Sequence, residues 1–417
     1  RSQFSLTLCF PRDILTSLWA PIFTRVPENC SSLLAMASPQ VLIVGAGVTG
    51  SLLATMIKDM GISVRLLEKS RGPGGRMATH SYRAGGRDTP VLARADLGAQ
   101  YITTRSPPDH AELGPLYNRF LDAGVLAPFT GKVAGPNPYG GAGEDIRHFS
   151  APLGLQAIAK HVLESGGVPV DWGVAVEELS LEDSGATHLK FAGGGAELET
   201  SETPRVVILT QPVPQALGES KFPIRGNFLD HVDPAVLDSL KRVEYSSRFA
   251  VAFFFDAFQW PFDWTARYFD GGDVRYVSHD SAKRGSPGES ALSIVVHSGV
   301  PLGIEFIDEA EPFAQAAERI LKDLEAKIPE VPWRKSAATK VHKWRYSQVY
   351  KGIGGLRPKP DWIWEPAALT DESAPGCVTL FKTARSLGLL CGDAFAPSSN
   401  FEGCVFSAFR AAAATRS

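Results

Sequence analysis

Hydrophobic residues along the chain occur in two patterns, short apolar runs and longer stretches with an apolar residue every three or four positions. The apolar run 41–44 is followed by a glycine-rich turn, and residues 52–60 then carry apolar side chains at helical spacing. This order predicts a buried strand, a tight turn and a helix. Further apolar runs at 62–68, 205–210 and 387–391 predict more buried strands.

Later parts of the chain alternate apolar and polar residues, which is typical of strands in antiparallel sheets. Short segments of this kind between residues 168 and 200 predict a small β-meander. Residues 243–350 contain strongly β-prone segments that predict an antiparallel sheet, and helical spacing over 313–328 predicts one long helix. The glycine-rich stretch 131–145 predicts a surface hairpin, and the Pro- and Gly-rich stretch 351–376 predicts an inserted loop.

Three glycines in the first turn follow Gly-x-Gly-x-x-Gly spacing. Gly45 permits the tight turn, Gly47 lets a pyrophosphate approach the backbone, and Gly50 allows the helix to pack closely. The N-terminus of that helix would direct free N–H groups and a positive dipole end at the phosphates. Because the chain has 40 glycines, a chance match in an ordinary strand, turn and helix is the alternative to a dinucleotide site.

Two features after this turn favour the dinucleotide site. Glu68 ends the next predicted strand, 18 residues after Gly50, where a ribose-binding carboxylate is expected. Gly75 and Arg76 follow in a Gly-Gly-Arg loop, which suits a backbone held against a cofactor with an arginine at its phosphates or flavin. With these residues the chain resembles the FAD-dependent superfamily that includes glutathione reductase and the flavin amine oxidases.

The resemblance extends to other parts of the chain. A buried strand ending in Gly-Asp is a FAD fingerprint of this superfamily, which implies that Asp393 accepts a hydrogen bond from the ribityl chain. The helix that begins near Phe401 would direct its positive end at the flavin N1–C2=O edge. In the meander, the resemblance implies that the backbone of Val176 meets the adenine. The alternative at the C-terminal end is an ordinary strand, loop and helix.

Six segments together resemble one branch of this superfamily, whose members oxidise isomeric dihydronicotinamide dinucleotides. These segments are residues 45–50, 70–77, 95–103, 245–250, 343–349 and 399–404. The resemblance implies an α/β fold in which a Rossmann-type FAD-binding domain of p-hydroxybenzoate-hydroxylase-like topology is joined to a smaller α+β substrate domain. It also implies non-covalent FAD, a 2- or 6-dihydro or α-anomeric NAD(P)H as substrate, and transfer of electrons to O₂, with β-NAD(P)⁺ and H₂O₂ as products.

The same resemblance assigns site residues. The matching flavin-binding positions are Thr49, Arg76, Gln100 and Tyr101. The matching catalytic positions in the substrate pocket are Tyr268, His297 and Arg275. Without the resemblance, His297 and Tyr268 would be interpreted as core residues with satisfied hydrogen bonds.

Two other functions stay open. Amine oxidases of this superfamily usually place a lysine near the flavin, in the strand that corresponds to residues 248–255, and this segment contains none. That favours the dihydronicotinamide substrate over an amine. A secreted signalling protein with a flavin-bound fold is the second alternative, although complete motifs at both ends of the chain argue against loss of the cofactor.

Composition limits the remaining possibilities. With 42 basic and 45 acidic residues the formal net charge is −3, which argues against a nucleic-acid-binding platform. The chain has no apolar run of membrane-spanning length, so we expect no membrane span. Five cysteines without a Cys-x-x-Cys pair predict no metal site and no disulfide framework, and favour a cytoplasmic location over secretion.

We expect a discontinuous domain organisation within the 417 residues. The FAD-binding domain is predicted to comprise residues 36–105, 152–242 and 377–417. The substrate domain is predicted to comprise residues 106–151 and 243–376. Residues 1–35 show no hydrophobic period, so we expect a disordered or spurious extension before Met36.

Overall fold

The computed structural model describes residues 39–416 except for 87, 105–112, 137–145, 194–195, 199–202, 220–222, 286–287, 310–311 and 354–373. Its first sheet has six strands in the order β19-β20-β13-β1-β2-β9, all parallel except the edge strand β19. We call the part of the chain built on it the parallel-sheet domain. Its strands are β1 (Val41–Val44), β2 (Val64–Glu68), β9 (Val170–Trp172), β13 (Val206–Leu209), β19 (Cys377–Lys382) and β20 (Leu387–Cys391).

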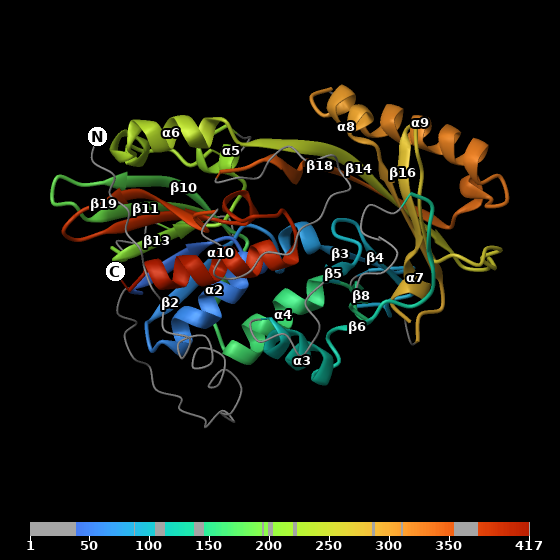
Figure 1. Cartoon of the computed structure of the whole chain (residues 1–417), viewed down its shortest axis with the longest axis horizontal. Helices are drawn as coiled ribbons and strands as arrows, with labels where there is room; N and C mark the ends of the chain where they lie inside the picture. Colours follow the sequence, from blue (N-terminus) through green and yellow to red (C-terminus); the bar gives the residue numbers. More distant parts are fainter. Residues whose placement is uncertain are drawn as a thin grey trace.

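Alternating side chains of this sheet fill two separate cores. In β1, Val41 and Ile43 pack with the helices, whereas Leu42 packs with the β-meander on the opposite face. Figure 1 shows α2 and α10 side by side against this sheet. The helices are α2 (Val48–Asp59), α4 (Gln156–Gly166) and α10 (Phe401–Ala414), and the meander strands are β10 (Val174–Leu181), β11 (Thr187–Gly193) and β12 (Ala196–Leu198).

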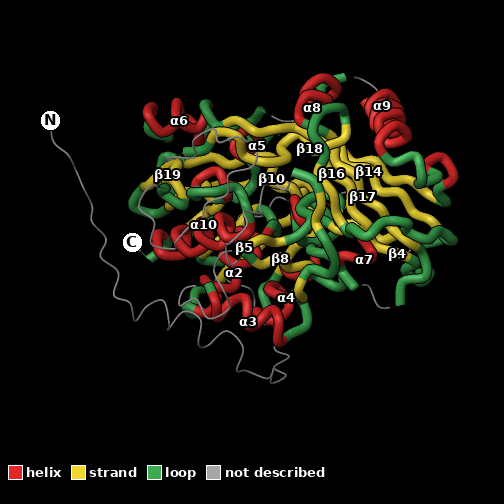
Figure 2. Tube along the Cα trace, turned by 45° about the vertical axis from the view of Figure 1, so that its right-hand side comes forward, coloured by secondary structure: helices red, strands yellow, loops and turns green. Residues whose placement is uncertain are grey.

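A second six-stranded sheet, in the order β18-β14-β17-β16-β15-β7, forms what we call the antiparallel-sheet domain. Its strands are β7 (Val133–Ala134), β14 (Glu244–Phe255), β15 (Ala266–Tyr268), β16 (Val274–His279), β17 (Leu292–Ser298) and β18 (Ala338–Lys351). Helices α8 (Val300–Phe306) and α9 (Pro312–Lys327) cover its outer face, as Figures 1 and 2 show. Along β14, Phe249, Val251 and Phe253 face these helices.

The inner face of the same sheet packs on the parallel-sheet domain. Ala250, Ala252 and Phe254 of β14 share a core with residues of the hairpin β3 (Thr79–Tyr82) and β4 (Ala93–Asp96). The inner face therefore meets the segment directly after β4.

The remaining elements are β5 (Ile102–Thr104), α3 (Gly114–Asp122), β6 (Ala127–Pro128), β8 (Arg147–Ser150), α5 (Val213–Ala216), α6 (Pro234–Lys241) and α7 (Asp280–Lys283).

The predicted α/β class with a separate antiparallel sheet is confirmed, as are the strand–turn–helix opening, the meander and the long helix. The surface hairpin predicted for 131–145 is wrong where the structure describes it, because β7 instead joins the edge of the antiparallel sheet, parallel to β15. Helix α3 packs in the same core as α2 and α4, through Tyr117 and Phe120, although we expected residues 106–151 in the substrate domain. Local composition did not reveal this long-range packing.

Several expectations lie outside the described residues. They concern the extension 1–35, residues 354–373 of the predicted insertion, and two of the five cysteines, Cys9 and Cys30. The described cysteines are free thiols. In the described part of the chain, every helix is too short or too polar to cross a membrane.

Candidate active site

The glycine turn between β1 and α2 has three positions with different steric surroundings. Gly45 has a φ of 108°, which favours glycine, and a Cβ added at Gly50 would lie 2.0 Å from the Gly45 carbonyl oxygen. Both glycines are therefore required by the fold itself. A Cβ added at Gly47 would meet no protein atom within 4 Å. The space beside Gly47, at the N-terminus of α2, is thus left open by the protein.

The Gly-Gly-Arg loop lies directly against this turn. The Gly74 amide donates to the Ala46 carbonyl over 2.8 Å, and Gly47 and Gly74 form an isolated parallel bridge. A Cβ added at Gly75 would lie 3.4 Å from the Gly47 Cα, and its φ is 53°. Two glycine-rich backbones therefore approach each other beside the open space, as expected for a phosphate-binding cradle.

Glu68 lies at the end of β2 and connects this strand to the glycine turn. Its Oε2 accepts a hydrogen bond from the Ala46 amide at 2.8 Å, and its Oε1 accepts one from the Ser70 amide at 2.7 Å. The side chain is buried. Each carboxylate oxygen retains a further lone pair. Glu68 therefore fixes the turn and keeps acceptor capacity for a ribose hydroxyl, the role predicted for it.

Arg76 and Asp393 bring the two ends of the chain together. The guanidinium donates two hydrogen bonds to the carboxylate, at 2.9 and 2.6 Å, and Ser399 donates a third at 2.6 Å. Burial raises the pKa of Asp393, but the charge and hydrogen bonds of Arg76 and the Ser399 hydroxyl outweigh it, so the pKa is lower than usual. Asp393 is therefore an anion held by protein donors, and a ribityl contact would be added to these bonds.

The N-terminus of α10 follows this ion pair along the chain. Asn400 caps the helix, and its Oδ1 accepts a hydrogen bond from the Gly403 amide at 2.8 Å. The ring of Phe401 packs with Tyr117 and Phe120 in the helix-side core. The Phe401 side chain is thus structural, and the predicted flavin contact of this residue would be made by its backbone.

A row of aromatic residues crosses the inner face of the antiparallel sheet. Tyr268 pairs with Tyr276 in the strand register, and Tyr276 pairs with His297. The ring centroids of Tyr268 and Tyr276 are 4.9 Å apart, and those of Tyr276 and His297 are 5.8 Å apart. From the parallel-sheet domain, the Tyr101 hydroxyl lies 2.7 Å from the Tyr268 hydroxyl. The structure thus brings three predicted residues together and adds Tyr276.

His297 is the titratable group at the centre of this row. Its Nε2 lies 3.1 Å from the Leu97 carbonyl oxygen and 3.1 Å from the Gln100 Nε2. Burial, followed by the charges of Arg248 and Lys283, lowers the pKa of His297 to about 3. The imidazole is therefore neutral at physiological pH and acts as a hydrogen-bonding group rather than a cation.

The other predicted residues have varied surroundings. Gln100 is buried, with protein partners at both ends of its amide. Thr49 is buried in the first turn of α2, and Val176 is buried in β10, where it pairs with Phe191 in the strand register. Arg275 lies 5.7 Å from the Tyr268 ring centroid and donates to the Phe269 carbonyl. It therefore supports the tyrosine from outside the aromatic row.

Residues that sequence reasoning missed come mainly from pairings between distant segments. Trp344 donates from Nε1 to the Leu97 carbonyl at 2.8 Å, beside His297. A buried network joins Asp96, the last residue of β4, to Asp280 and Lys283 of α7. The alternation of Tyr276 with Ser278 in one β-prone segment was the available signal for an inward-facing residue. The sequence carried no comparable signal for Lys283.

The neutral state of His297 predicts a pH dependence of stability. An unfolded chain binds a proton on this imidazole below about pH 6.5, whereas the folded chain does so only below about pH 3. Unfolding is thus coupled to proton uptake between these values, and stability falls as the pH is lowered through this window. We expect His297→Gln to make the decline between pH 6 and 4 shallower in urea titrations. An equally steep decline in the variant would contradict the assignment.

These features fit FAD. The open space beside Gly47, the paired glycine loops, the Glu68 carboxylate at the strand end and the capped N-terminus of α10 lie where a dinucleotide and a flavin require them. Among the described residues there is no group of His, Cys, Asp and Glu side chains suited to a metal ion.

Comparisons with known proteins agree with this geometry. Residues 132–415 match the family described as flavin containing amine oxidoreductase, and residues 43–120 match the NAD(P)-binding Rossmann-like domain. The chain is 30% identical to renalase from Mus musculus over 375 residues, which covers 88% of this chain and 96% of the mouse protein. This match confirms the resemblance to one branch of the superfamily that the six sequence segments indicated.

Solved structures show the same fold at low sequence identity. A putative protoporphyrinogen oxidase from Exiguobacterium sp. 255-15 superposes with a TM-score of 0.61 at 14% identity, covering 91% of this chain and 99% of that one. Cyclohexylamine oxidase from Brevibacterium oxydans IH-35A superposes with a TM-score of 0.59 at 14% identity, covering 90% and 98%. With FAD as its cofactor, the chain belongs to the flavin-containing amine oxidoreductases, as a renalase-like member of that family.

Proposed function

We propose that the protein is an FAD-dependent oxidase of isomeric dihydronicotinamide dinucleotides, namely 2- or 6-dihydro or α-anomeric NAD(P)H. The reaction converts the dihydronicotinamide, O₂ and one proton into β-NAD(P)⁺ and H₂O₂. Bound FAD supplies the acceptor of the hydride at N5 and the route of two electrons to O₂. The protein supplies binding, orientation and a defined electrostatic environment.

The observation that carries this proposal is the neutral imidazole of His297 within an aromatic row. A dihydronicotinamide loses a hydride to become an aromatic pyridinium, so the enzyme has no substrate proton to remove. Burial lowers the pKa of His297 to about 3 and raises that of Tyr276 well above 10. Neither group is a base suited to deprotonating an amine at neutral pH. The inner positions of β14 include Ala250 and Ala252, and the segment 248–255, in which an amine oxidase usually carries a lysine, contains none.

The proposed roles of the residues follow from their positions. Tyr268 would pack on the planar nicotinamide ring, with the buried Tyr276 packed behind it, and His297 would make one hydrogen bond that orients the substrate. Arg275 would hold Tyr268 in place through its ring contact. Thr49 and Tyr101 would bind the flavin and Val176 the adenine, and the two glycine loops would bind the pyrophosphate.

A flavin amine oxidase is the second candidate. The observation in its favour is the match of residues 132–415 to the flavin containing amine oxidoreductase family, together with the fold shared with cyclohexylamine oxidase. That match covers the antiparallel sheet that would bind the substrate. An amine substrate would have to bind beside the row of Tyr268, Tyr276 and His297, where His297 is not a base at neutral pH.

Peroxide release separates the two candidates. Purified holoenzyme is mixed aerobically with each dihydronicotinamide isomer, with β-NADH, and with a panel of primary and secondary amines, and H₂O₂ is recorded against product formation. We expect one H₂O₂ for each β-NAD(P)⁺ formed from an isomeric dihydronicotinamide, and none from amines. Turnover of amines alone would replace the proposal by the second candidate.

Direct hydride transfer predicts a specific isotope pattern. Deuterium at the transferred position is expected to slow flavin bleaching about two- to fivefold, whereas solvent deuterium changes it little, because the transferred hydrogen comes from carbon. His297→Ala is expected to slow bleaching about 10- to 100-fold by misplacing the ring, with a clear residual rate. Rapid-mixing reduction measures both. A substrate isotope effect near unity on a chemistry-limited step would contradict direct transfer.

A further inference from the structure

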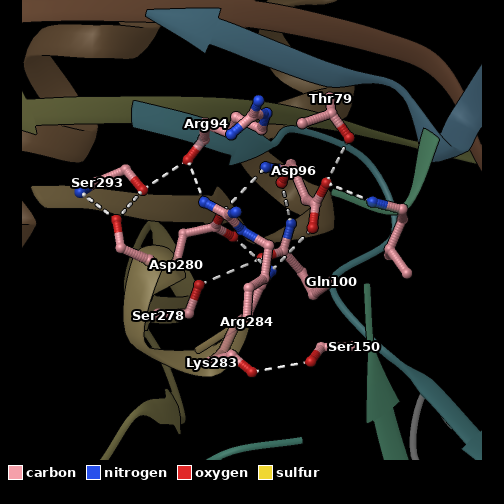
Figure 3. A network of polar contacts seen from close by, with 12 residues as sticks. Thr79, Arg94, Asp96, Gln100, Ser150, Ser278, Asp280, Lys283, Arg284 and Ser293 are labelled. Atoms are coloured by element: carbon pink, nitrogen blue, oxygen red, sulfur yellow. Dashed lines mark hydrogen bonds and ion pairs between the residues drawn. The ribbon is translucent and has the colours of Figure 1, made fainter. Parts of the chain in front are cut away.

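Gln100 is held between the two domains in a single orientation. Its Oε1 accepts hydrogen bonds from the Lys283 ammonium at 3.0 Å and from the Ser278 hydroxyl at 3.2 Å. Since an ammonium group has only donors, the amide oxygen must face Lys283. The Nε2 end donates to the carbonyls of Asp96 and Gly98. Figure 3 shows Gln100 within this network.

Lys283 is itself immobilised. It is fully buried, and its Nζ lies 2.5 Å from Asp280 Oδ1 and 3.7 Å from Asp96 Oδ2. Asp280 also accepts from Arg284 Nε at 3.0 Å, and Arg284 pairs with Glu289. The network therefore fixes the donor that orients Gln100, and it connects α7 to the segment that follows β4.

Hydrogen-bond counting determines the tautomer of His297. Three carbonyl oxygens, those of Asp96, Leu97 and Gly98, lie within reach of the Gln100 amide nitrogen or of His297 Nε2. The amide nitrogen has two protons, and the carbonyls of Asp96 and Gly98 accept both, so Gln100 has none left for His297 Nε2. At 3.1 Å from the Leu97 oxygen a bare lone pair on Nε2 would face another acceptor, so Nε2 carries a proton and shares this carbonyl with Trp344 Nε1. With Nε2 protonated and the ring neutral, Nδ1 holds a lone pair.

The second ring nitrogen is available to a ligand. Among the described residues, no protein group hydrogen-bonds to Nδ1 of His297, and Nδ1 is absent from the buried polar atoms that lack a partner. Since the side chain is half-buried in the aromatic row, Nδ1 faces accessible space there. A lone pair at this position accepts a hydrogen bond from an N–H or O–H group.

We propose that Gln100 is a positioning residue for His297. Because Lys283 holds the amide oxygen of Gln100, the amide nitrogen, which is not an acceptor, faces His297 Nε2. His297 Nε2 therefore donates to the Leu97 carbonyl, and Nδ1 accepts a hydrogen bond from the substrate. The ligand group is an uncharged N–H or O–H donor, such as a carboxamide. The charged groups that face His297 are Arg248 of β14, and Lys283 and Asp280 of α7. This tautomer assignment stands without the proposed function, whereas the identity of the ligand rests on it.

The test uses FAD-loaded protein labelled with ¹⁵N-histidine. The chain has nine histidines, and the signal of His297 is assigned as the one that disappears in His297→Gln. Long-range ¹H–¹⁵N spectra at neutral pH are expected to show His297 as the neutral Nε2–H tautomer. A wild-type ring that is cationic, or protonated on Nδ1, overturns the proposal. This readout needs neither substrate nor turnover.

Gln100→Glu provides the decisive variant, because it preserves side-chain length and the contact with Lys283 but places an acceptor beside His297 Nε2. We expect His297 to become doubly protonated at pH values where the wild-type ring is neutral, and the affinity for β-NAD⁺ to fall about tenfold, the effect of one hydrogen bond. The matched control Gln100→Met removes the amide without adding an acceptor, and its His297 is expected to stay neutral.

The outcomes separate this inference from the proposed function. If His297 stays neutral in Gln100→Glu, or becomes charged in Gln100→Met as well, the positioning role of Gln100 is wrong. If Gln100→Glu fails to fold, Lys283→Gln serves instead, because an amide at position 283 permits both orientations of Gln100 and predicts a mixture of tautomers. If wild-type protein shows the Nε2–H tautomer but does not bind β-NAD⁺, the proposed substrate is wrong and the tautomer assignment stands.

Discussion

Gly47→Val is expected to yield a folded protein that binds no detectable FAD at micromolar concentrations. The backbone at Gly47 has a φ of −69° and a ψ of −179°, which any residue adopts, and an added Cβ meets no protein atom. The fold therefore tolerates the side chain. The same side chain would occupy the space beside the α2 N-terminus that a pyrophosphate needs.

The flavin absorbance of the purified variant and its far-UV circular dichroism measure the two halves of this prediction. Gly86→Val is the matched control, because a Cβ at Gly86 also meets no protein atom within 4 Å but lies in the β3–β4 loop. It is expected to keep its FAD. Gly50→Ala is expected to lose the fold as well as the cofactor, since its Cβ would lie 2.0 Å from the Gly45 oxygen. Full flavin occupancy in Gly47→Val would show that the pyrophosphate lies elsewhere.

Asp280→Ala is expected to lower the free energy of unfolding by about 3–5 kcal/mol, because it removes from two buried cations the carboxylate that pairs with both of them. Asp280 is fully buried, pairs with Lys283 and Arg284, and accepts from the Asp96 amide at 3.3 Å. Equilibrium urea unfolding followed by circular dichroism measures the loss. Removal of this carboxylate also weakens the contact between the two domains, so FAD is expected to dissociate at lower urea concentration.

An exposed ion pair gives the control for this substitution. Asp263 pairs with Lys132 at 3.0 Å, with most of both side chains in solvent. Asp263→Ala is expected to change the urea midpoint little, because solvent screens such a pair. A similarly small change for Asp280→Ala would mean that groups other than these ion pairs stabilise the buried network.

The cofactor half of the site was predictable because its signals are local. Gly45, Gly47 and Gly50 lie within six residues, and their roles follow from backbone sterics that spacing alone encodes. Glu68 ends one buried strand and Asp393 lies two residues after the end of another, where side chains reach the carboxyl edge of a parallel sheet. The strand pattern thus predicted both where the sheet lies and where its functional edge lies.

The substrate half depended on register between distant strands. Tyr268, Tyr276 and His297 lie in one row only because β15, β16 and β17 pair in a particular alignment with one irregularity in β16. A shift by one residue would turn a side chain to the opposite face. The resemblance supplied Tyr268 and His297, but a residue between them in space, such as Tyr276, required the paired strands.

The buried network was the least predictable part. Asp96 and Asp280 are 184 residues apart, and in sequence a charged segment such as Asp280 to Arg284 favours a solvent-exposed turn. Only the packing of α7 against β4 makes these charges interior. Gln100 was predicted as a flavin-binding residue and that contact stays a prediction, but its side-chain amide is engaged by protein groups at both ends.

The central claim is that FAD in this protein takes a hydride from an isomeric dihydronicotinamide. Anaerobic mixing of the holoenzyme with a stoichiometric amount of one candidate reductant, with the flavin absorbance recorded over time, tests it most directly. We predict rapid bleaching by 2- or 6-dihydro or α-anomeric NAD(P)H, with β-NAD(P)⁺ as the product and with return of the yellow colour when O₂ is admitted. A flavin that stays oxidised with each of these isomers, but is bleached by an amine, would contradict the account.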